Sequence, residues 1–494
     1  MSGRNVNVSM NEKDTRALHF CRSIGRLPLG MSKVLVNLVM ALSTDHGGRH
    51  PIELALSPFF QYQYSSITDV LTNMSRTPEE YANLTKSILA MIARLIPARQ
   101  REVLHLALDS VVVKHPFSET LEDVSYIAIA NNVIAGNKPL SIGYNVSSLN
   151  ICLEKGWCLP LSFQRIPTTA TALDVGLSQI KTVHEVVGTK DSLALVSSDT
   201  KYSSRKFLGP CFAMDNVVVL ARLLSNSKVY DSRPRQTSGA PQVYGTAWHL
   251  TEKSGEKIMH RQDKEIRYNQ HSIHDRTAEE TLTIERYTKK NRKLAITLRR
   301  YNNVMLRSRQ GVNMKDKPFD VLAVEVRDAE TNKRVFKRDM FVAIFGKRKD
   351  EISTLQAFEE YHSRLDIEST FRVEKQNLLL EKYQTCKKQN FENWLLVIQL
   401  ALWLLWESST EAQATPKKWQ KHYDSEVRDA RKSQRLPLTQ TIKATSGLFC
   451  TFDLKEFAPQ KCKKGKGRQK GQTQVPRPRY SVVRKSKKKS INSS

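Results

Sequence analysis

The chain has 494 residues, enough for about two to four domains with a large core, and its 78 Lys and Arg outnumber its 49 Asp and Glu to give a formal net charge of +29. A cationic excess of this size favours a nucleic-acid partner first and an anionic membrane surface second. The seven cysteines include no Cys-x-x-Cys pair, so zinc-finger spacing is absent and reduced thiols in the cytoplasm are expected. The strongly apolar run 394–406 has 13 residues. A membrane span needs ~20, so a buried helix is predicted there and a membrane function is disfavoured.

Residues 1–100 carry apolar side chains at helical spacing and predict a small helical domain. Thr77, followed by Pro78 and two glutamates, is the expected N-cap of the last of its helices. In a basic protein such a domain either reads DNA ends or serves only for packing, and the sequence leaves both open.

Residues 101–230 change to a strand-rich pattern. The run 103–113 is rich in leucine and β-branched residues, which is typical of a strand in the middle of a sheet. Further strand-like runs lead to a predicted helix at 171–187, a strand at 192–199, a short helix, and a strand at 216–224. This order of three strands, helix, strand, helix, strand predicts an α/β sheet with antiparallel and parallel parts.

Residues 231–350 predict a β-rich, basic insertion that ends in a hairpin at 319–346. A helical segment, 351–412, is expected to complete the core, and a basic region, 413–494, follows. After Glu456 there is no acidic residue, yet 13 of 38 positions are Lys or Arg. Such a composition predicts a disordered polycationic tail from about residue 457.

A charged run near the end of the core draws attention because of its spacing. Tyr361, Arg364, Glu368 and Lys375 lie at offsets of 0, 3, 7 and 14. On an α-helix that turns about 100° per residue, all four share an arc of roughly 60°. One carboxylate between two cations and a phenol suits a phosphate backbone together with a hard metal ion. The alternative is a solvated charged face with i, i+4 ion pairs.

Two aspartates stand where strands meet the rim of the predicted sheet. Asp109 lies inside an apolar strand, where a carboxylate must be paired, solvated or bound to metal. Asp199 ends a buried strand, at the edge where open α/β sheets place their ligands. Taken singly, each acid is more often structural, and Asp199 is also a plausible helix cap. Together with Glu368, they predict a cluster of three carboxylates that binds Mg²⁺ or Mn²⁺. Two such ions, about 3.5–4 Å apart, serve phosphodiester chemistry.

At this point a resemblance becomes specific. The spacing Tyr-x2-Arg-x3-Glu-x6-Lys, here Tyr361, Arg364, Glu368 and Lys375, resembles the signature of the bacterial insertion-sequence DDE transposases of the "IS-four" type. The runs LALD and VSSDTKYSS and the β-rich insertion before the glutamate helix resemble that subclass in the same order, over about residues 100–410. The N-terminal domain and the tail match only in general character.

The resemblance implies a ribonuclease-H-like core and cut-and-paste DNA transposition by a homodimer that holds two transposon ends. Asp109, Asp199 and Glu368 would be the catalytic residues and would hold two metal ions, with Mg²⁺ expected and Mn²⁺ possible. Arg364 and Lys375 would grip phosphates and Tyr361 would contact the transferred strand, with Arg222 as a further candidate for DNA contact. The DNA partners would be terminal inverted repeats and target DNA, in the bacterial cytoplasm near the nucleoid.

Three expectations concern side chains nearby. Trp248 is the only tryptophan of the insertion and is expected to be a packed indole rather than a stacking partner for a flipped base. Asp191 and Asp215 are rival carboxylates, but each precedes its strand and so belongs to the wrong edge of the sheet. Two other functions stay open: a decayed transposase that only binds DNA, and a stand-alone nuclease on the same core.

Overall fold

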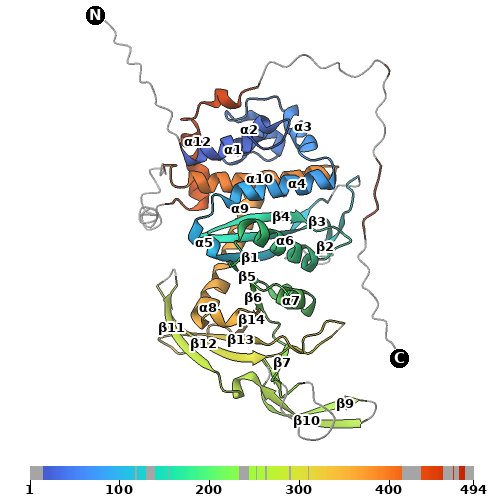
Figure 1. The fold of residues 1–494 in the computed structure, drawn as a ribbon, viewed down its shortest axis with the longest axis vertical. Helices are drawn as coiled ribbons and strands as arrows, with labels where there is room; N and C mark the ends of the chain where they lie inside the picture. Colours follow the sequence, from blue (N-terminus) through green and yellow to red (C-terminus); the bar gives the residue numbers. More distant parts are fainter. Residues whose placement is uncertain are drawn as a thin grey trace, which may run out of the picture.

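The computed structural model describes most of the chain from residue 15 onward (Figure 1). The described ranges are 15–116, 120–128, 140–154, 156–232, 244–251, 253–261, 264–288, 291–309, 311–413, 435–459, residue 471 and 478–483. Most of the predicted disordered tail therefore lies outside the described residues.

Along the chain, a helical segment is followed by a segment of mixed helices and strands, a β-rich segment and a second helical segment. The α-helices are α1 (Arg16–Gly25), α2 (Ser32–Leu42), α3 (Ser65–Asn73), α4 (Pro78–Ala93), α5 (Ala98–Glu102), α6 (Ala172–Val187), α7 (Arg205–Phe212), α8 (Thr354–Ser363), α9 (Asp366–Gln376), α10 (Lys388–Ser408) and α12 (Leu438–Phe449). The strands are β1 (Val103–Lys114), β2 (Ser125–Ala128), β3 (Leu140–Glu154), β4 (Trp157–Arg165), β5 (Leu193–Ser198), β6 (Val217–Arg222), β7 (Lys228–Tyr230), β8 (Ala247–His249), β9 (Gly255–Arg261), β10 (Lys264–Ser272), β11 (Glu280–Tyr287), β12 (Lys293–Val304), β13 (Phe319–Asp328) and β14 (Met340–Phe345).

The elements described in the first hundred residues are helices, as the pattern predicts, and together with α10 and α12 they form a layer at one end of the molecule (Figure 1). Thr77 caps α4 as expected, because its side chain accepts a hydrogen bond from the Glu80 amide and Pro78 occupies the first helical position. Helix α10 contains the apolar run and is buried along most of its length between the other helices and β4. No helix among the described residues combines the length and apolar character that crossing a membrane requires.

A ten-stranded mixed sheet forms the centre of the molecule, in the order β11-β12-β13-β14-β6-β5-β1-β3-β2, with β4 also paired to β3. Strands β1, β5 and β6 are parallel, whereas β1–β3 and β3–β4 are antiparallel. The chain is thus α/β with a mixed sheet, as predicted. Four strands precede α6, whereas the predicted order counts three.

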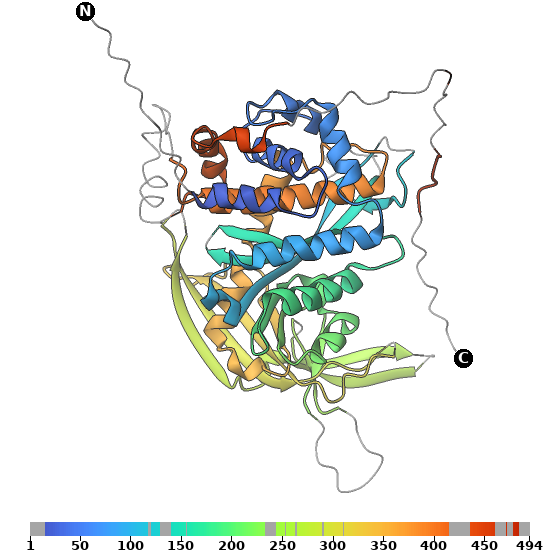
Figure 2. The same ribbon diagram turned by 45° about the horizontal axis from the view of Figure 1, so that its top comes forward.

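The β-rich insertion is joined to the central sheet. Strand β14 pairs antiparallel with β6, so β11–β14 extend the sheet that β1–β6 begin. The curved pair β11 and β12 packs against α8 (Figure 2). Strands β7–β10 form a separate four-stranded sheet beyond it. Pairing with β14 covers the edge that β6 would otherwise leave open.

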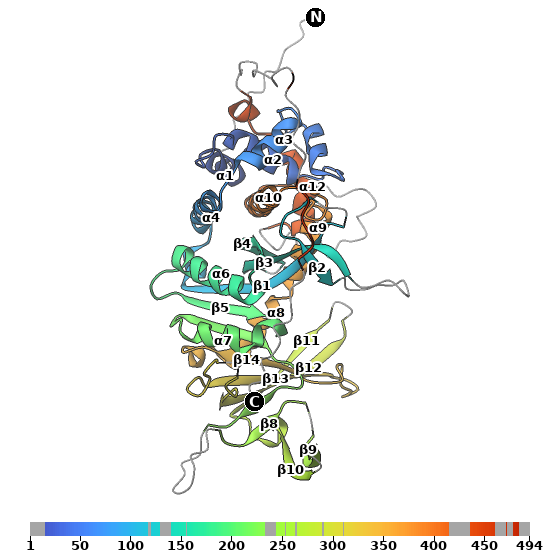
Figure 3. The same cartoon turned by 90° about the vertical axis from the view of Figure 1, so that its right-hand side faces the viewer.

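The two faces of the sheet have different cover (Figure 3). Helices α6 and α7 pack on one face, and α8 and α9 pack on the other. Alternation along the strands sends Leu104, Leu106 and Leu108 toward the first face. Ala107 faces Ile367 of α9 on the second, so Asp109, two residues further along β1, shares the face that α8 and α9 cover.

The single helix expected across the charged run is wrong. Helix α8 ends at Ser363 and α9 begins at Asp366, and the link makes i→i−3 bonds from the Leu365, Ile367 and Glu368 amides. Such a 3₁₀-like turn advances about 120° per residue instead of 100°, which rotates Glu368 away from the arc of Tyr361. The four side chains therefore do not share one exposed face.

Candidate functional site

The register of two parallel strands brings the predicted aspartates together. Leu108 of β1 is paired with Ser198 of β5, so Asp109 and Asp199, each the next residue, lie side by side where β5 ends. Asp199 follows the end of its strand as expected, whereas Asp109 lies inside β1, which continues to Lys114 in pairing with β3. Both also point to the face covered by α8, because the side chains of a strand alternate. Their closeness is visible in the pKa of Asp109, which burial raises above its usual value and which the neighbouring charge of Asp199 raises further.

Cations from two other elements compensate this pair of carboxylates. The Arg364 Nη1 donates to Asp109 Oδ2 at 3.1 Å, and Asp109 Oδ1 accepts from the Ser110 amide at 2.7 Å. On the other side, the Lys201 ammonium donates to Ser110 Oγ at 3.0 Å. Arg364, Lys201 and the Ser110 amide each lower the pKa of Asp109 and so oppose the effect of its burial.

Asp199 fulfils the capping role that its sequence position suggested. Its Oδ1 accepts from the Lys201 amide at 3.0 Å, at the start of a 3₁₀ turn, Thr200–Ser203. The cap uses one oxygen in a short turn, which leaves the carboxylate beside Asp109. Tyr202, buried under this turn, has a pKa raised first by burial and then by both aspartates. Capping and membership of the pair are therefore compatible.

Tyr361 and Arg364 are placed beside the aspartates, but both are buried. Tyr361 is 4% exposed and packs in the apolar layer under α8, and burial raises the pKa of its phenol. Arg364 is 7% exposed, with its guanidinium 5.6 Å from the Tyr361 ring. Arg222 stays exposed at the end of β6 and lowers the pKa of Tyr361 through its charge. Among the predicted DNA contacts near the pair, Arg222 is thus accessible, whereas Tyr361 and Arg364 are inside.

Glu368 and Lys375 are less closely associated with the pair. Glu368 lies exposed in the first turn of α9, next to Ile367, which packs on Ala107 of β1. Lys375, near the end of the same helix, forms an ion pair with Glu381 at 2.8 Å. The structure therefore places Glu368 on the element that covers the Asp109 face, and it pairs Lys375 with an acid of the loop that follows.

The donor set fits a hard divalent cation in part. Asp109 and Asp199 are adjacent carboxylates, and carboxylate oxygens are the ligands that Mg²⁺ and Mn²⁺ prefer. The pKa of Asp109 is also raised, first by burial. In the described part of the chain, however, no group of three or more His, Cys, Asp or Glu side chains is arranged to hold a metal ion. The aspartates are brought together, and Glu368 is not assembled with them into the expected three-ligand cluster.

The rival residues lie where the sequence reasoning put them. Asp215 pairs with Lys347 at 2.5 Å, and the Asp191 carbonyl accepts from Arg348, both at the amino-terminal edge of β5 and β6. Trp248 donates from Nε1 to Asp231 at 2.8 Å and packs against His271, as a structural indole would.

Lys201 is the site residue that sequence reasoning missed. It is exposed, it contacts the strand that carries Asp109, and its amide is capped by Asp199. The signal was present as the segment Asp199-Thr200-Lys201, in which an aspartate at a strand end caps a turn two residues before a cation.

Comparison with known proteins adds no relative: no family model matches the chain, and no curated protein matches its sequence.

Proposed function

We propose that this protein is a metal-dependent DNA transposase that moves an insertion sequence by cut and paste. The observation that carries the proposal is the pair Asp109 and Asp199, held on one face where the parallel pairing of β1 and β5 ends. The mixed order of antiparallel and parallel strands is what a ribonuclease-H-like core requires, and the +29 net charge suits a DNA partner. The order of the motif residues along the chain supports the same function.

Asp109 and Asp199 would hold the divalent ion, and Glu368 would join them from α9. When bound, Mg²⁺ or Mn²⁺ would activate the attacking oxygen and stabilise the leaving oxygen of a phosphodiester, with two ions expected from the resemblance. The chain itself supplies the oriented carboxylates: the Ser110 amide fixes one oxygen of Asp109 and Arg364 fixes the other. The Lys201 amide fixes Asp199.

DNA contact falls to the cations that remain accessible beside the pair. Lys201 and Arg222 are exposed at the ends of β5 and β6, so both side chains are accessible to a phosphate. Arg364 is nearly buried and already paired, so its role in this arrangement is to position Asp109. The proposed partners are double-stranded terminal repeats and target DNA, bound by a homodimer in the bacterial cytoplasm.

A second candidate function is favoured by one observation. In the described residues no three-carboxylate group is formed, and the Arg364 guanidinium neutralises Asp109 where a metal ion would otherwise do so. A decayed transposase that binds DNA without cutting it would have this arrangement. The two candidates make opposite predictions about cleavage.

The deciding experiment uses duplexes that carry the DNA flanking the coding region, including any inverted repeats, with Mg²⁺ or Mn²⁺. The transposase is expected to cut at the repeat boundary and to join the freed 3′ end to target DNA. Asp199→Asn and Glu368→Gln should bind the repeats and fail to cut, whereas Asp191→Asn, altered at the opposite edge, should cut normally. Binding without cleavage by the unaltered protein would support the decayed candidate, and cleavage without joining would indicate a nuclease. Equal binding to unrelated DNA would refute the proposal.

A further inference from the structure

The edge strand β2 carries a short segment from the far C-terminal region of the same chain. Strand β2 ends the ten-stranded sheet, with β3 as its neighbour. Next to it, the Val483 amide donates to the Val124 carbonyl at 2.9 Å, and Val483 forms a parallel bridge with Ser125. Val482 packs against the main apolar core. The segment 478–483 therefore binds in an extended form, with one backbone bond to the sheet and one apolar anchor.

The sequence of this segment suits an edge strand. Tyr480, Val482 and Val483 are residues with high strand propensity. Pro476 and Pro478 precede them and favour extended backbone before each proline. A proline cannot donate to a sheet ladder, so strand pairing cannot spread backward through these positions. The contact is thus limited to the few residues after Pro478.

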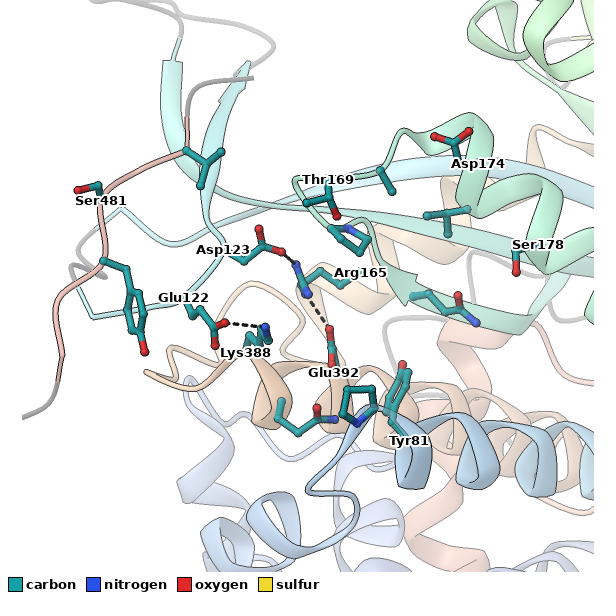
Figure 4. Close-up of a pocket in the computed structure, with 18 residues that line it drawn as sticks. Tyr81, Glu122, Asp123, Arg165, Thr169, Asp174, Ser178, Lys388, Glu392 and Ser481 are labelled. Atoms are coloured by element: carbon teal, nitrogen blue, oxygen red, sulfur yellow. Dashed lines mark hydrogen bonds and ion pairs between the residues drawn. The ribbon is translucent and has the colours of Figure 1, made fainter. Parts of the chain in front are cut away.

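A cavity of about 830 Å³ lies beside this contact, between α4, α6, α10 and the end of β4 (Figure 4). Tyr480, Ser481 and Val483 form one of its walls. Its other walls carry four carboxylates, which are Glu122, Asp123, Asp174 and Glu392. Two cations also line it: Arg165 pairs with Asp123 and Glu392, and Lys388 pairs with Glu122 (Figure 4). Four carboxylates against two cations leave a formal excess of two negative charges. In a chain with a net charge of +29, this is a local excess of negative charge.

The chain around the segment has the opposite charge. Residues 476–489 contain seven Lys and Arg and no acid, and the run from 484 to 489 follows Val483 directly. An acidic cavity wall lowers the energy of a bound segment whose flanking sequence is rich in Lys and Arg, through long-range attraction. Backbone pairing to a sheet edge supplies affinity, and an apolar side chain supplies register.

We propose that β2 and the acidic cavity beside it form a strand-addition site for an extended basic peptide, and that its occupant is the chain's own segment 478–483. Docking there fixes Val483, the residue before the basic run of the sequence, at the sheet edge and covers an edge that would otherwise be open to other chains. The inference does not depend on the proposed catalytic function.

Hydrogen exchange on the full-length protein tests the docking. The Val483 amide is expected to exchange at least tenfold more slowly in the protein than in a synthetic peptide of residues 476–490. Val482→Asp, which removes the apolar anchor, should abolish this protection. Val475→Asp makes the same chemical change before the docked segment and should leave it intact. Equal exchange in protein and peptide, or equal effects of the two variants, would overturn the proposal.

Competition then tests specificity. The labelled 476–490 peptide should bind the full-length Val482→Asp protein at least tenfold more tightly than a scrambled peptide of the same composition. Glu122→Lys in that background should weaken binding at least threefold. Equal binding of the scrambled peptide would show charge attraction alone and would refute a strand-addition site. A dimer that dissociates on Val482→Asp, seen by sedimentation, would show that a second copy is the occupant and would contradict the assignment.

Discussion

Replacing Arg364 with Met removes the cation that holds Asp109 while keeping much of the side-chain volume. The ion pair is 3.1 Å long, and its two side chains are 9% and 20% exposed. Coulomb's law at an effective dielectric constant near 20 gives about 5 kcal/mol at this separation. Desolvation of the guanidinium, which the substitution relieves, offsets about half of that, so the free energy of unfolding is expected to fall by about 2–3 kcal/mol at pH 7.

The loss of stability should depend on pH, because only the ionised form of Asp109 is attracted by the Arg364 guanidinium. Burial raises the folded-state pKa of Asp109 above its unfolded value, and without Arg364 this pKa rises further. A carboxyl group whose pKa is higher in the folded than in the unfolded protein lowers the free energy of unfolding as pH rises from the unfolded-state pKa to the folded-state pKa. The loss of stability caused by Arg364→Met is therefore complete at pH 7 and becomes smaller toward pH 4.

The assay is urea unfolding followed by the fluorescence of the buried tryptophans of α10, at pH 7 and pH 4.5. Asp109→Asn supplies a second background, in which Arg364→Met should cost much less. Lys347→Met breaks the exposed pair with Asp215, in which the side chains are 48% and 75% exposed, and should change the stability by less than about 1 kcal/mol. A loss from Arg364→Met that is independent of pH, or no larger than that of Lys347→Met, would refute the reasoning.

Three further predictions follow from single contacts. For binding to duplex DNA, Lys201→Met should reduce the steepness of the plot of log binding constant against log salt concentration by about 0.9, the value expected for one phosphate contact. Lys190→Met, at the other end of β5, should leave this slope unchanged. Equal slopes for the two variants would contradict a phosphate contact by Lys201. Burial raises the pKa of Glu374, whose carboxylate oxygens have no hydrogen-bond partner among the described residues, so folding loses stability as pH rises from the unfolded toward the folded pKa. Glu374→Gln should therefore raise the urea midpoint at pH 8 more than at pH 4.5, and a difference independent of pH would argue against a protonated Glu374. Thr171→Ala removes the capping box of α6 and should lower the free energy of unfolding, measured by thermal unfolding, by about 1 kcal/mol. Thr171→Ser retains the capping box and is the control. An unchanged unfolding midpoint for Thr171→Ala would contradict the prediction.

The parts of the site that local pattern encodes were predictable. The apolar runs of β1, β5 and β6 and the period of α6 fix those elements within one or two residues. Once β1 and β5 are parallel neighbours, Asp109 and Asp199 must lie side by side, because each follows the last residue through which these two strands are paired. The same argument excludes Asp191, which precedes β5.

The parts that depend on distant contacts were not predictable. No Gly or Pro marks the break between α8 and α9. The break accompanies burial of Tyr361 under the sheet face and of Arg364 against Asp109, and neither contact leaves a local signal. Likewise, the pairing of β14 with β6 joins the insertion to the core through a long-range contact that no alternation pattern reveals.

The most direct measurement is anomalous diffraction from crystals of the protein bound to a duplex carrying its flanking repeats and soaked in Mn²⁺, with cleavage blocked by a non-hydrolysable linkage. The account predicts a Mn²⁺ peak about 2.0–2.6 Å from carboxylate oxygens of both Asp109 and Asp199, with Glu368 brought to the same ion. No peak at the two aspartates, with Arg364 still paired to Asp109 in the DNA-bound protein, would contradict it.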